Sequence, residues 1–296
     1  MAGFDFSAIK VRLPEKLNFG TGGIPLSTPA PTTLAGISQA RKLGLDAMEL
    51  EFVHSVNLNE ATASEVYSSV SKNSFILTCH GSYYINLNAK EPQKRGASRS
   101  RILQAADIAR KAGAWSLTFH PAFYLGMEKE SVYAVVKEQL GKVISELQEK
   151  GNEIWIRPET TGKPVQFGEL KEIIRLSNDL EQVMPCIDFA HLHARTNGKN
   201  NSPQEFRAIL SEVEKGLGKD GLDNMHIHMS GIAYSEKGEK NHLELEDSDF
   251  NFKDLIKVWK EFAIKGTVVC ESPNLEKDAL VMKESLIHPV DVFALQ

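Results

Sequence analysis

The sequence has few cysteines, no long apolar run and no excess of positive charge. Cys79, Cys186 and Cys270 each lie in a short apolar run without C-x-x-C spacing, so we expect buried, reduced thiols. Residues 1–16 contain no apolar signal region, and no later segment is long enough to span a bilayer, so we expect a cytoplasmic protein without a membrane partner. A formal net charge of −5 argues against a general nucleic-acid coat but allows an enzyme with a local positive site.

Short apolar runs alternate with longer amphipathic stretches along the chain. The runs predict eight strands, at residues 17–20, 47–52, 75–80, 115–120, 153–159, 183–188, 224–228 and 267–271. Eight strand–helix units match a (β/α)₈ TIM barrel, with a doubly wound open sheet as the alternative. No Pro- or Gly-rich linker divides the chain. We therefore predict the α/β class, one TIM-barrel domain over residues 1–296, and a monomer.

Local signals also predict where some helices begin and end. Gly151 follows a long amphipathic stretch and suits the first position after a helix. Ser202 is a candidate cap, with Pro203 in the first turn and Glu205 three residues after the serine. Residues 90–101 hold five cations and one carboxylate, and their composition favours a solvated helix start over a nucleic-acid contact.

Imidazoles and carboxylates recur at the ends of six consecutive predicted strands. In a barrel all these ends face one side, where they would converge; the residues are His80, His120, Glu159, Asp188, His226 with His228, and Glu271. Converging carboxylates repel one another and are costly to bury, and bound metal removes both problems. Ligands of this kind suit Zn²⁺, Mn²⁺ or Fe²⁺ better than Mg²⁺, and their number allows more than one ion.

The motifs resemble those of endonuclease IV, the zinc-dependent apurinic/apyrimidinic endonucleases, and most closely an archaeal-type branch. The resemblance covers residues 75 to 280, and its order and spacing are more specific than any single motif. The matching segments are CHGSYYINL (79–87), FHP (119–121), PETTGK (158–163), CIDFAH (186–191), MHIH (225–228), HLEL (242–245) and CESPN (270–274).

The resemblance implies a (β/α)₈ barrel with a cluster of zinc ions that cleaves duplex DNA 5′ to abasic sites and trims 3′ blocking groups. It implies two or three ions in this chain, in sites formed by His80 and His120 for the first, Asp188, His226 and Glu271 for the second, and His191 and His242 for the third. Glu159 would bridge the first two ions and act as the catalytic residue. Tyr83 and Tyr84 would contact DNA beside the lesion.

The chain departs from the family pattern at two places. Lys240 stands where the family has an aspartate ligand of the third ion, so that site is expected to be degraded. Glu239, His228 and His193 are candidate replacements, and for His193 we favour a supporting hydrogen bond over metal binding. Residues 1–45 also lack the early His-x-Ser segment of the family.

Two other functions fit parts of the pattern. Sugar isomerases and epimerases on the same barrel type use four ligands around one divalent ion, here Glu159, Asp188, His226 and Glu271. The remaining histidines, His80, His120, His191 and His242, are the feature that such an enzyme does not need. The third function is a non-catalytic, metal-dependent DNA-binding protein, which the cation at Lys240 allows.

Overall fold

Eight parallel strands form the centre of the computed structural model, which describes residues 14–287. The strands are β1 (Leu17–Gly22), β2 (Ala47–Glu51), β3 (Ile76–His80), β4 (Ala114–Phe119), β6 (Trp155–Pro158), β8 (Cys186–Asp188), β9 (Met225–Met229) and β12 (Gly266–Cys270). Their spatial order is β6-β4-β3-β2-β1-β12-β9-β8. Two bridges, Ile156 to Val183 and Glu159 to Cys186, join the outer strands and nearly close the barrel. The predicted fold class is therefore confirmed.

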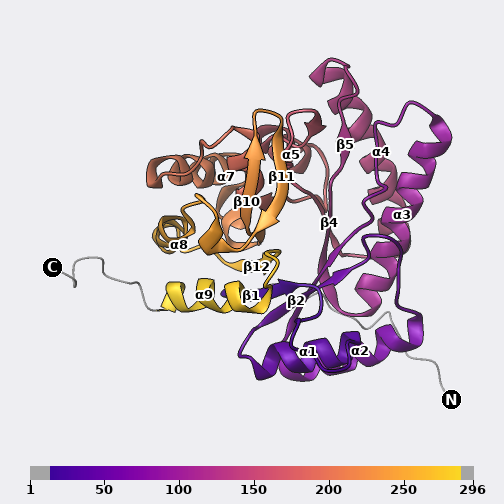
Figure 1. The fold of residues 1–296 in the computed structure, drawn as a ribbon. Coiled ribbons are helices and arrows are strands. Elements are labelled where there is room, and N and C mark those ends of the chain that lie inside the picture. The colour runs from indigo at the N-terminus through magenta and orange to yellow at the C-terminus, as the bar shows by residue number, and fades with distance from the viewer. Residues whose placement is uncertain (1–13, 288–296) are drawn as a thin grey trace.

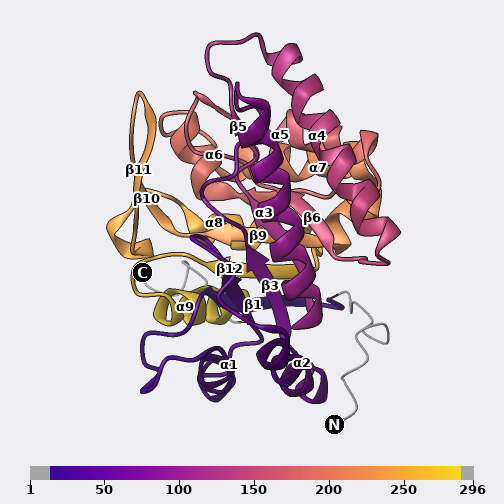
Figure 2. The same cartoon turned by 90° about the vertical axis from the view of Figure 1, so that its right-hand side faces the viewer.

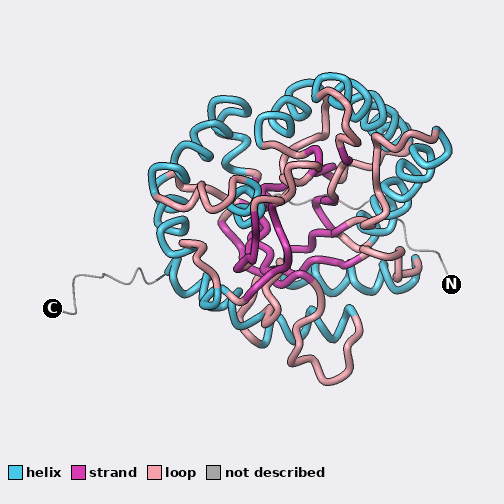
Figure 3. Tube along the Cα trace, turned by 45° about the horizontal axis from the view of Figure 1, so that its top comes forward, coloured by secondary structure: helices cyan, strands magenta, loops and turns pink. Residues whose placement is uncertain are grey.

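Helices surround these strands, as Figures 1 and 3 show. They are α1 (Thr33–Lys42), α2 (Glu60–Asn73), α3 (Pro92–Lys111), α4 (Lys129–Glu149), α5 (Leu170–Asp179), α6 (Phe189–Arg195), α7 (Pro203–Asp223), α8 (Phe252–Glu261) and α9 (Glu276–Ile287), with a short 3₁₀ turn at Leu245–Asp247. No helix within residues 14–287 is long and apolar enough to cross a membrane. Residues 1–13, on which most of the expectation about a signal region depends, lie outside the described part.

Two small antiparallel sheets were not predicted from the sequence. β5 (Ala122–Phe123) pairs with β7 (Gln166–Phe167) in the loops that follow β4 and β6. β10 (Gly231–Ser235) and β11 (Gly238–Leu243) form a hairpin after β9, which Figure 2 shows beside the barrel. Both sheets lie in loops that leave the carboxyl ends of barrel strands. They therefore belong to the side of the barrel where TIM-barrel enzymes carry their active sites.

The predicted helix boundaries agree with the structure. Gly151 follows α4 with a φ of 62°, the left-handed conformation that glycine adopts most easily. Ser202 caps α7, and the side chains of Ser202 and Glu205 form a reciprocal capping box. Helix α3 begins at Pro92, inside the basic stretch at residues 90–101. All three cysteines are buried and free, as expected.

The barrel interior is polar, which is unusual because branched apolar residues normally fill it. Glu49 pairs in register with Thr78, and Thr118 pairs with Arg157, so these side chains share the interior face. All four are buried. Burial of so many polar groups costs free energy, so the interior points to function rather than stability.

Candidate metal centre

Glu159 follows β6 directly and lies at the centre of a group of imidazoles. Its Oε1 atom lies 3.2 Å from Nδ1 of His191 and 3.3 Å from Nδ1 of His228. His80 and His120, at the ends of β3 and β4, each place Nε2 3.5 Å from a carboxylate oxygen of Glu159. Side chains from five segments of the barrel therefore meet at one carboxylate that is itself fully buried.

Asp188 and His191 are joined by the start of α6. Asp188 ends β8 and caps this helix, because its Oδ1 accepts a hydrogen bond of 2.6 Å from the backbone N–H of His191. Its other oxygen, Oδ2, lies 3.4 Å from Nδ1 of His191. His242 on β11 adds a third imidazole, with its ring centre 5.8 Å from that of His191. Glu271 follows β12, and its Oε2 lies 3.4 Å from Nδ1 of His228.

Five groups of ligand atoms within residues 14–287 are compact enough to hold a metal ion, because in each group all ligand atoms lie within 4.8 Å of one another. Three of them share residues around Glu159 and Asp188: His80 with His120 and Glu159, Glu159 with Asp188, His228 and Glu271, and Asp188 with His191 and His242. The other two combine His228 with His80 and Glu271, and His228 with Cys186 and His226. Imidazole nitrogens and carboxylate oxygens are suitable Zn²⁺ ligands. The sharing of Glu159 and Asp188 between groups places the three positions next to one another.

The structure assigns different places to the two histidines of β9. His228 lies with Glu159, Asp188 and Glu271, where the sequence predicted His226. His226 points into the same interior two residues earlier, where Nδ1 lies 2.9 Å from Oγ of Ser116. Two residues along a strand keep the same face but move a side chain by roughly 6.6 Å. The ligand set supported by the geometry therefore contains His228 in place of His226.

A β-bulge in β11 changes the expectation about Lys240. Ala233 pairs with Asn241 while Tyr234 pairs with Glu239, so Lys240 is the extra, unpaired residue. The bulge brings Glu239 to the face of the hairpin that carries His242, and Oε2 of Glu239 lies 3.5 Å from Nε2 of His191. Lys240 is exposed and does not line the site. The bulge thus places a carboxylate beside His191 from position 239 rather than from position 240.

His193 lies away from these groups. Its Nδ1 is 2.8 Å from the carbonyl oxygen of Lys199, and its Nε2 is 3.1 Å from a carboxylate oxygen of Asp249. Asp249 also accepts a hydrogen bond of 2.6 Å from the Tyr234 hydroxyl. His193 therefore ties α6 to the segment that follows the hairpin, which agrees with the supporting role that we favoured.

Several residues of the site were missed by sequence reasoning. Glu49 and Glu51 on β2 point into the interior, and Lys163 and Gln166 line the cavity above it. A signal was present for the two glutamates, because carboxylates at alternate positions of an apolar strand must share one face. Burial and the neighbouring Glu49 raise the pKa of Glu51 to about 8. No comparable pattern marked Lys163, in the turn after β6, or Gln166, which begins the short strand β7.

Tyr83 lies at the rim of the site, and Tyr84 follows it in the chain. Their side chains are 61% and 62% exposed, a large fraction for tyrosine. The ring of Tyr83 is 5.7 Å from that of His80, while the guanidinium of Arg101 lies 5.9 Å from the ring centre of Tyr84. The two rings are therefore available to a ligand beside the carboxylate and imidazole groups.

The electrostatics of the site fit a cation. Burial alone would raise the pKa of Glu159, but the imidazoles of His228 and His120 outweigh it and hold that pKa well below its usual value. Burial raises the pKa of Asp188 to about 6 against the opposing effect of His191. Buried Oε2 of Glu159, Oδ2 of Asp188 and Nε2 of His191 have no hydrogen-bond partner within residues 14–287. Unpaired buried atoms of these types are what metal coordination would satisfy.

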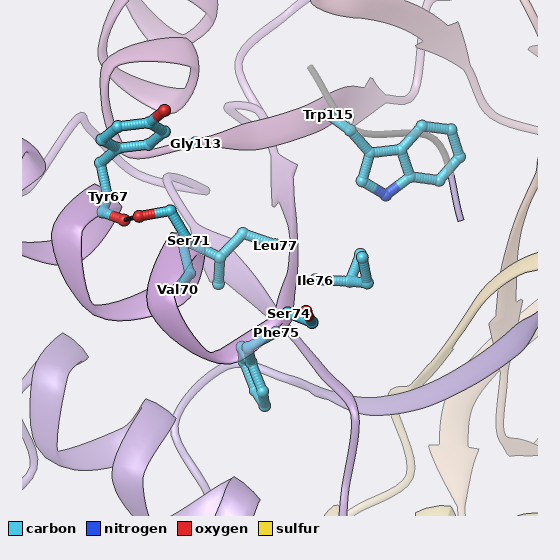
Figure 4. Close-up of a pocket in the computed structure, with 9 residues that line it drawn as sticks. All are labelled: Tyr67, Val70, Ser71, Ser74, Phe75, Ile76, Leu77, Gly113 and Trp115. Carbon is cyan, nitrogen blue, oxygen red and sulfur yellow. Dashed lines mark hydrogen bonds between the residues drawn. The ribbon is translucent and has the colours of Figure 1, made fainter. Parts of the chain in front are cut away.

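The metal-ligand groups open into a cavity of about 260 Å³. Its lining comprises Tyr83, Lys163, Gln166 and Glu239 together with His80, His120, Glu159, His191, His242 and Glu271. A second cavity, of about 180 Å³, lies at the opposite ends of β3 and β4 and is shown in Figure 4. Its nine lining residues, Trp115 and Phe75 among them, include neither a carboxylate nor an imidazole. Of these two cavities, the first has the groups needed for metal chemistry.

Comparisons with known proteins agree with this architecture. The chain is 41% identical to an uncharacterised protein of Methanocaldococcus jannaschii over 90% of this chain and 95% of the relative. It is 24% identical to a probable endonuclease 4 of Mycoplasma pneumoniae, over 67% of this chain and 68% of that protein.

Solved structures with the same fold include enzymes with different names. Endonuclease IV from Thermus thermophilus matches with a TM-score of 0.70 and 17% identity, over 90% of this chain and 97% of that chain. A D-tagatose 3-epimerase-like protein matches with a TM-score of 0.66 and 15% identity, over 90% and 96%. The family model described as xylose isomerase-like TIM barrel matches residues 37–288. The chain therefore belongs to the xylose isomerase-like TIM barrel family.

Proposed function

We propose that this protein is a zinc-dependent phosphodiesterase that nicks duplex DNA 5′ to abasic sites and trims 3′ blocking groups. The observation that carries the proposal is the meeting of His80, His120 and His191 at Glu159, within 3.2 to 3.5 Å. A centre for one ion has no use for these three imidazoles in addition to the four-ligand group. Relatives such as the probable endonuclease 4 of Mycoplasma pneumoniae support the same assignment.

The roles of the residues follow from their positions. His80 and His120 would hold one ion, and Asp188, His228 and Glu271 a second. Bound zinc supplies an activated water at neutral pH and positive charge for the phosphate oxygens. Glu159 faces both sets, so its carboxylate would fix their separation and orient the attacking water toward phosphorus.

The third group of ligands would hold an ion that stabilises the leaving 3′-oxygen of the cleaved phosphodiester. Asp188, His191 and His242 would hold a third ion, with Glu239 as an additional carboxylate beside His191. Asp188, His191 and His242 give three ligands, and Glu239 beside His191 would be the fourth that zinc generally takes. We therefore propose three positions for zinc, because Lys240, which was expected to degrade the third, is exposed and lies outside the cavity lining.

Rim residues would bind the DNA. Tyr83 and Tyr84 present exposed rings, and aromatic stacking on a base contributes about 1–3 kcal/mol. Lys163 lines the cavity, where an ammonium can contact a phosphate oxygen. Together with the metal ions, these contacts would allow a protein of negative net charge to bind DNA at the mouth of this cavity.

A sugar epimerase is the second candidate. Glu159, Asp188, His228 and Glu271 form one compact group, which is enough for a single ion. Epimerases are also among the structures that share this fold. The third function considered from the sequence, a non-catalytic DNA-binding protein, depended on Lys240, which lies outside the cavity.

Metal analysis and an incision assay test the proposal together. Protein purified without chelator should contain at least two zinc ions per chain and should nick a duplex with a single abasic site, leaving a 3′-hydroxyl. Glu159→Gln should lower the nicking rate about 100-fold or more, because it removes the charge shared by the ions. Glu153→Gln, an exposed position before β6, is the matched control.

Two outcomes would contradict the proposal. Full nicking by Glu159→Gln would exclude the catalytic role of that carboxylate. One ion per chain at saturation, with epimerisation of a ketose and no nicking under any metal, would establish the epimerase instead.

A further inference from the structure

Glu49 lies in the middle of β2, below the metal-ligand groups, and has no role in the function proposed above. Its carboxylate is fully buried and reaches across the barrel to β9. Oε1 lies 3.0 Å from Nε2 of His228, and Oε2 lies 3.0 Å from Nε2 of His226. Within residues 14–287, no lysine or arginine forms an ion pair with Glu49. The two imidazoles are therefore its charge partners.

The contacts of Glu49 determine where the imidazole protons lie. A buried carboxylate is stable only when donors face it. The 3.0 Å contacts are not collinear with the ring N–H bonds, so the four atoms involved have no aligned hydrogen bond in the described part of the chain. The carboxylate can accept hydrogen bonds from both rings only if both Nε2 atoms carry protons. For His226 this tautomer is also favoured by Ser116, whose hydroxyl can donate to Nδ1 over 2.9 Å.

The position of the proton on Nε2 of His228 determines what the other ring nitrogen, Nδ1, can do. Nδ1 of His228 is 3.3 Å from Oε1 of Glu159 and 3.4 Å from Oε2 of Glu271. With the proton on Nε2, Nδ1 presents a lone pair to two carboxylates. Three acceptors that face one another repel unless a cation lies among them: without metal a proton on Nδ1 serves, in the hydrogen bond to Glu159, and with metal the ion takes its place.

We propose that Glu49 is a positioning residue, which holds His228 as the Nε2–H tautomer and so directs its Nδ1 lone pair to the metal. Histidines that bind metals usually donate their other N–H to a carboxylate or carbonyl, which fixes the ring and increases its basicity. Glu49 is held firmly enough for this, because β2 pairs with both neighbours and Glu49 lies opposite Gly22 and Thr78. The inference rests on the metal centre of the proposed function but not on DNA as substrate.

Zinc affinity of three variants tests the inference without any DNA. Glu49→Gln keeps the size of the side chain but offers one acceptor and one donor, so it can no longer accept from both rings. We expect zinc at the affected position to bind about 10- to 100-fold more weakly, measured by competition with a chromophoric chelator. Glu49→Asp keeps the charge and should recover part of the loss. Ser116→Ala, which alters the same layer without contacting His228, should bind zinc like the unmodified protein.

Nitrogen-15 spectra of the histidines give a readout that a general structural defect would not reproduce. In the zinc-loaded protein, His228, assigned by the signal missing from His228→Asn, should carry its proton on Nε2. A proton on Nδ1 would overturn the inference, even if Glu49→Gln fails to fold. Unchanged zinc affinity in folded Glu49→Gln would also overturn it. A protein that binds zinc in a Glu49-dependent way but never nicks DNA would refute the proposed function and leave this inference intact.

Discussion

At the scale of single residues, the position of a histidine along its barrel strand determines which groups it contacts. His226 and His228 are both histidines of β9, and both side chains point into the barrel interior. Burial, opposed by Glu49, lowers the pKa of His226 to about 4, and this histidine contacts Ser116. His228 instead has Glu159 and Glu271 within 3.4 Å of Nδ1. Two residues of displacement therefore separate a structural histidine from a candidate metal ligand.

The two histidines can be distinguished by metal content. We expect His228→Asn to lose one zinc ion per chain at saturation, because it removes a ligand from the group with Asp188 and Glu271. His226→Asn should keep the full number of ions. Elemental analysis after equilibrium dialysis measures both. Loss of an ion from His226→Asn alone would show that the ligand is His226, as the sequence resemblance implied.

At the scale of secondary-structure elements, one extra residue in β11 rearranges the third group. In a regular hairpin the partner of Tyr234 would be Lys240, next to His191. The bulge replaces it with Glu239, which lies 3.5 Å from that imidazole. A carboxylate thereby takes the place that regular pairing would give to an ammonium, and the pairing of Gly238 shifts by one residue as well.

Variants of the bulge test this exchange. Lys240→Asp should leave zinc content and nicking unchanged, because the side chain at position 240 is exposed. Deletion of Lys240 should restore regular pairing, turn Glu239 away from His191 and remove up to one ion per chain. Elemental analysis of the zinc content of the two folded variants tests whether Glu239, placed by the bulge, contributes to the third group. A gain of one zinc in Lys240→Asp would mean instead that Lys240 blocks the site.

The capping box of α7 predicts a pH dependence of stability. Hydrogen bonds from the Ser202 hydroxyl and from the backbone N–H groups of Asn201 and Asn200 lower the pKa of Glu205 from 4.5 to about 2. A lowered pKa stabilises the folded state above pH 4.5, and this stabilisation is lost as pH falls toward 2. Glu205→Gln should therefore lower the free energy of unfolding by about 1 kcal/mol at pH 7.

The difference from the unmodified protein should shrink as the pH falls from 4.5 to 2. Urea unfolding at several pH values measures it, with Glu214→Gln, an exposed position on the same helix, as the control. A difference that is independent of pH would contradict the assignment of this stabilisation to the ionised carboxylate.

At the scale of the whole molecule, closure of the barrel concentrates negative charge. Glu159, Asp188 and Glu271 come from three strand ends that are distant in sequence, and Glu49 and Glu51 lie on a fourth strand. Bringing these carboxylates together opposes folding unless cations compensate them. The free energy of metal binding should therefore appear as stability of the whole fold.

Zinc should raise the free energy of unfolding by an amount set by the ratio of free zinc to its dissociation constant. At a hundredfold excess over the dissociation constant, one ion adds roughly 2.7 kcal/mol, which raises the thermal midpoint by several degrees. Melting curves with added zinc and with chelator measure the shift. Glu159→Gln should show a smaller shift, because it weakens the shared ligand. An equal midpoint with and without zinc would contradict a metal centre of this strength.

The amino-acid sequence by itself determined the barrel and the side of it that carries chemistry. The apolar runs have the length and spacing of barrel strands, and capping residues such as Ser202 act within one turn of chain, so local order was enough to place them. His80, His120 and Glu159 were predicted at strand ends because parallel strands direct all their ends to one face. These features depend on neighbours in the sequence and on chain direction.

Only the tertiary structure decided which of these side chains meet. The choice of His228 over His226 depends on the register of β9 against β8 and β12, and the choice of Glu239 over Lys240 depends on a bulge between two strands. Glu49 acquires its partners across the barrel, from a strand about 180 residues later in the chain. Such contacts are fixed by register and closure, which follow from the packing of the whole barrel rather than from any local pattern.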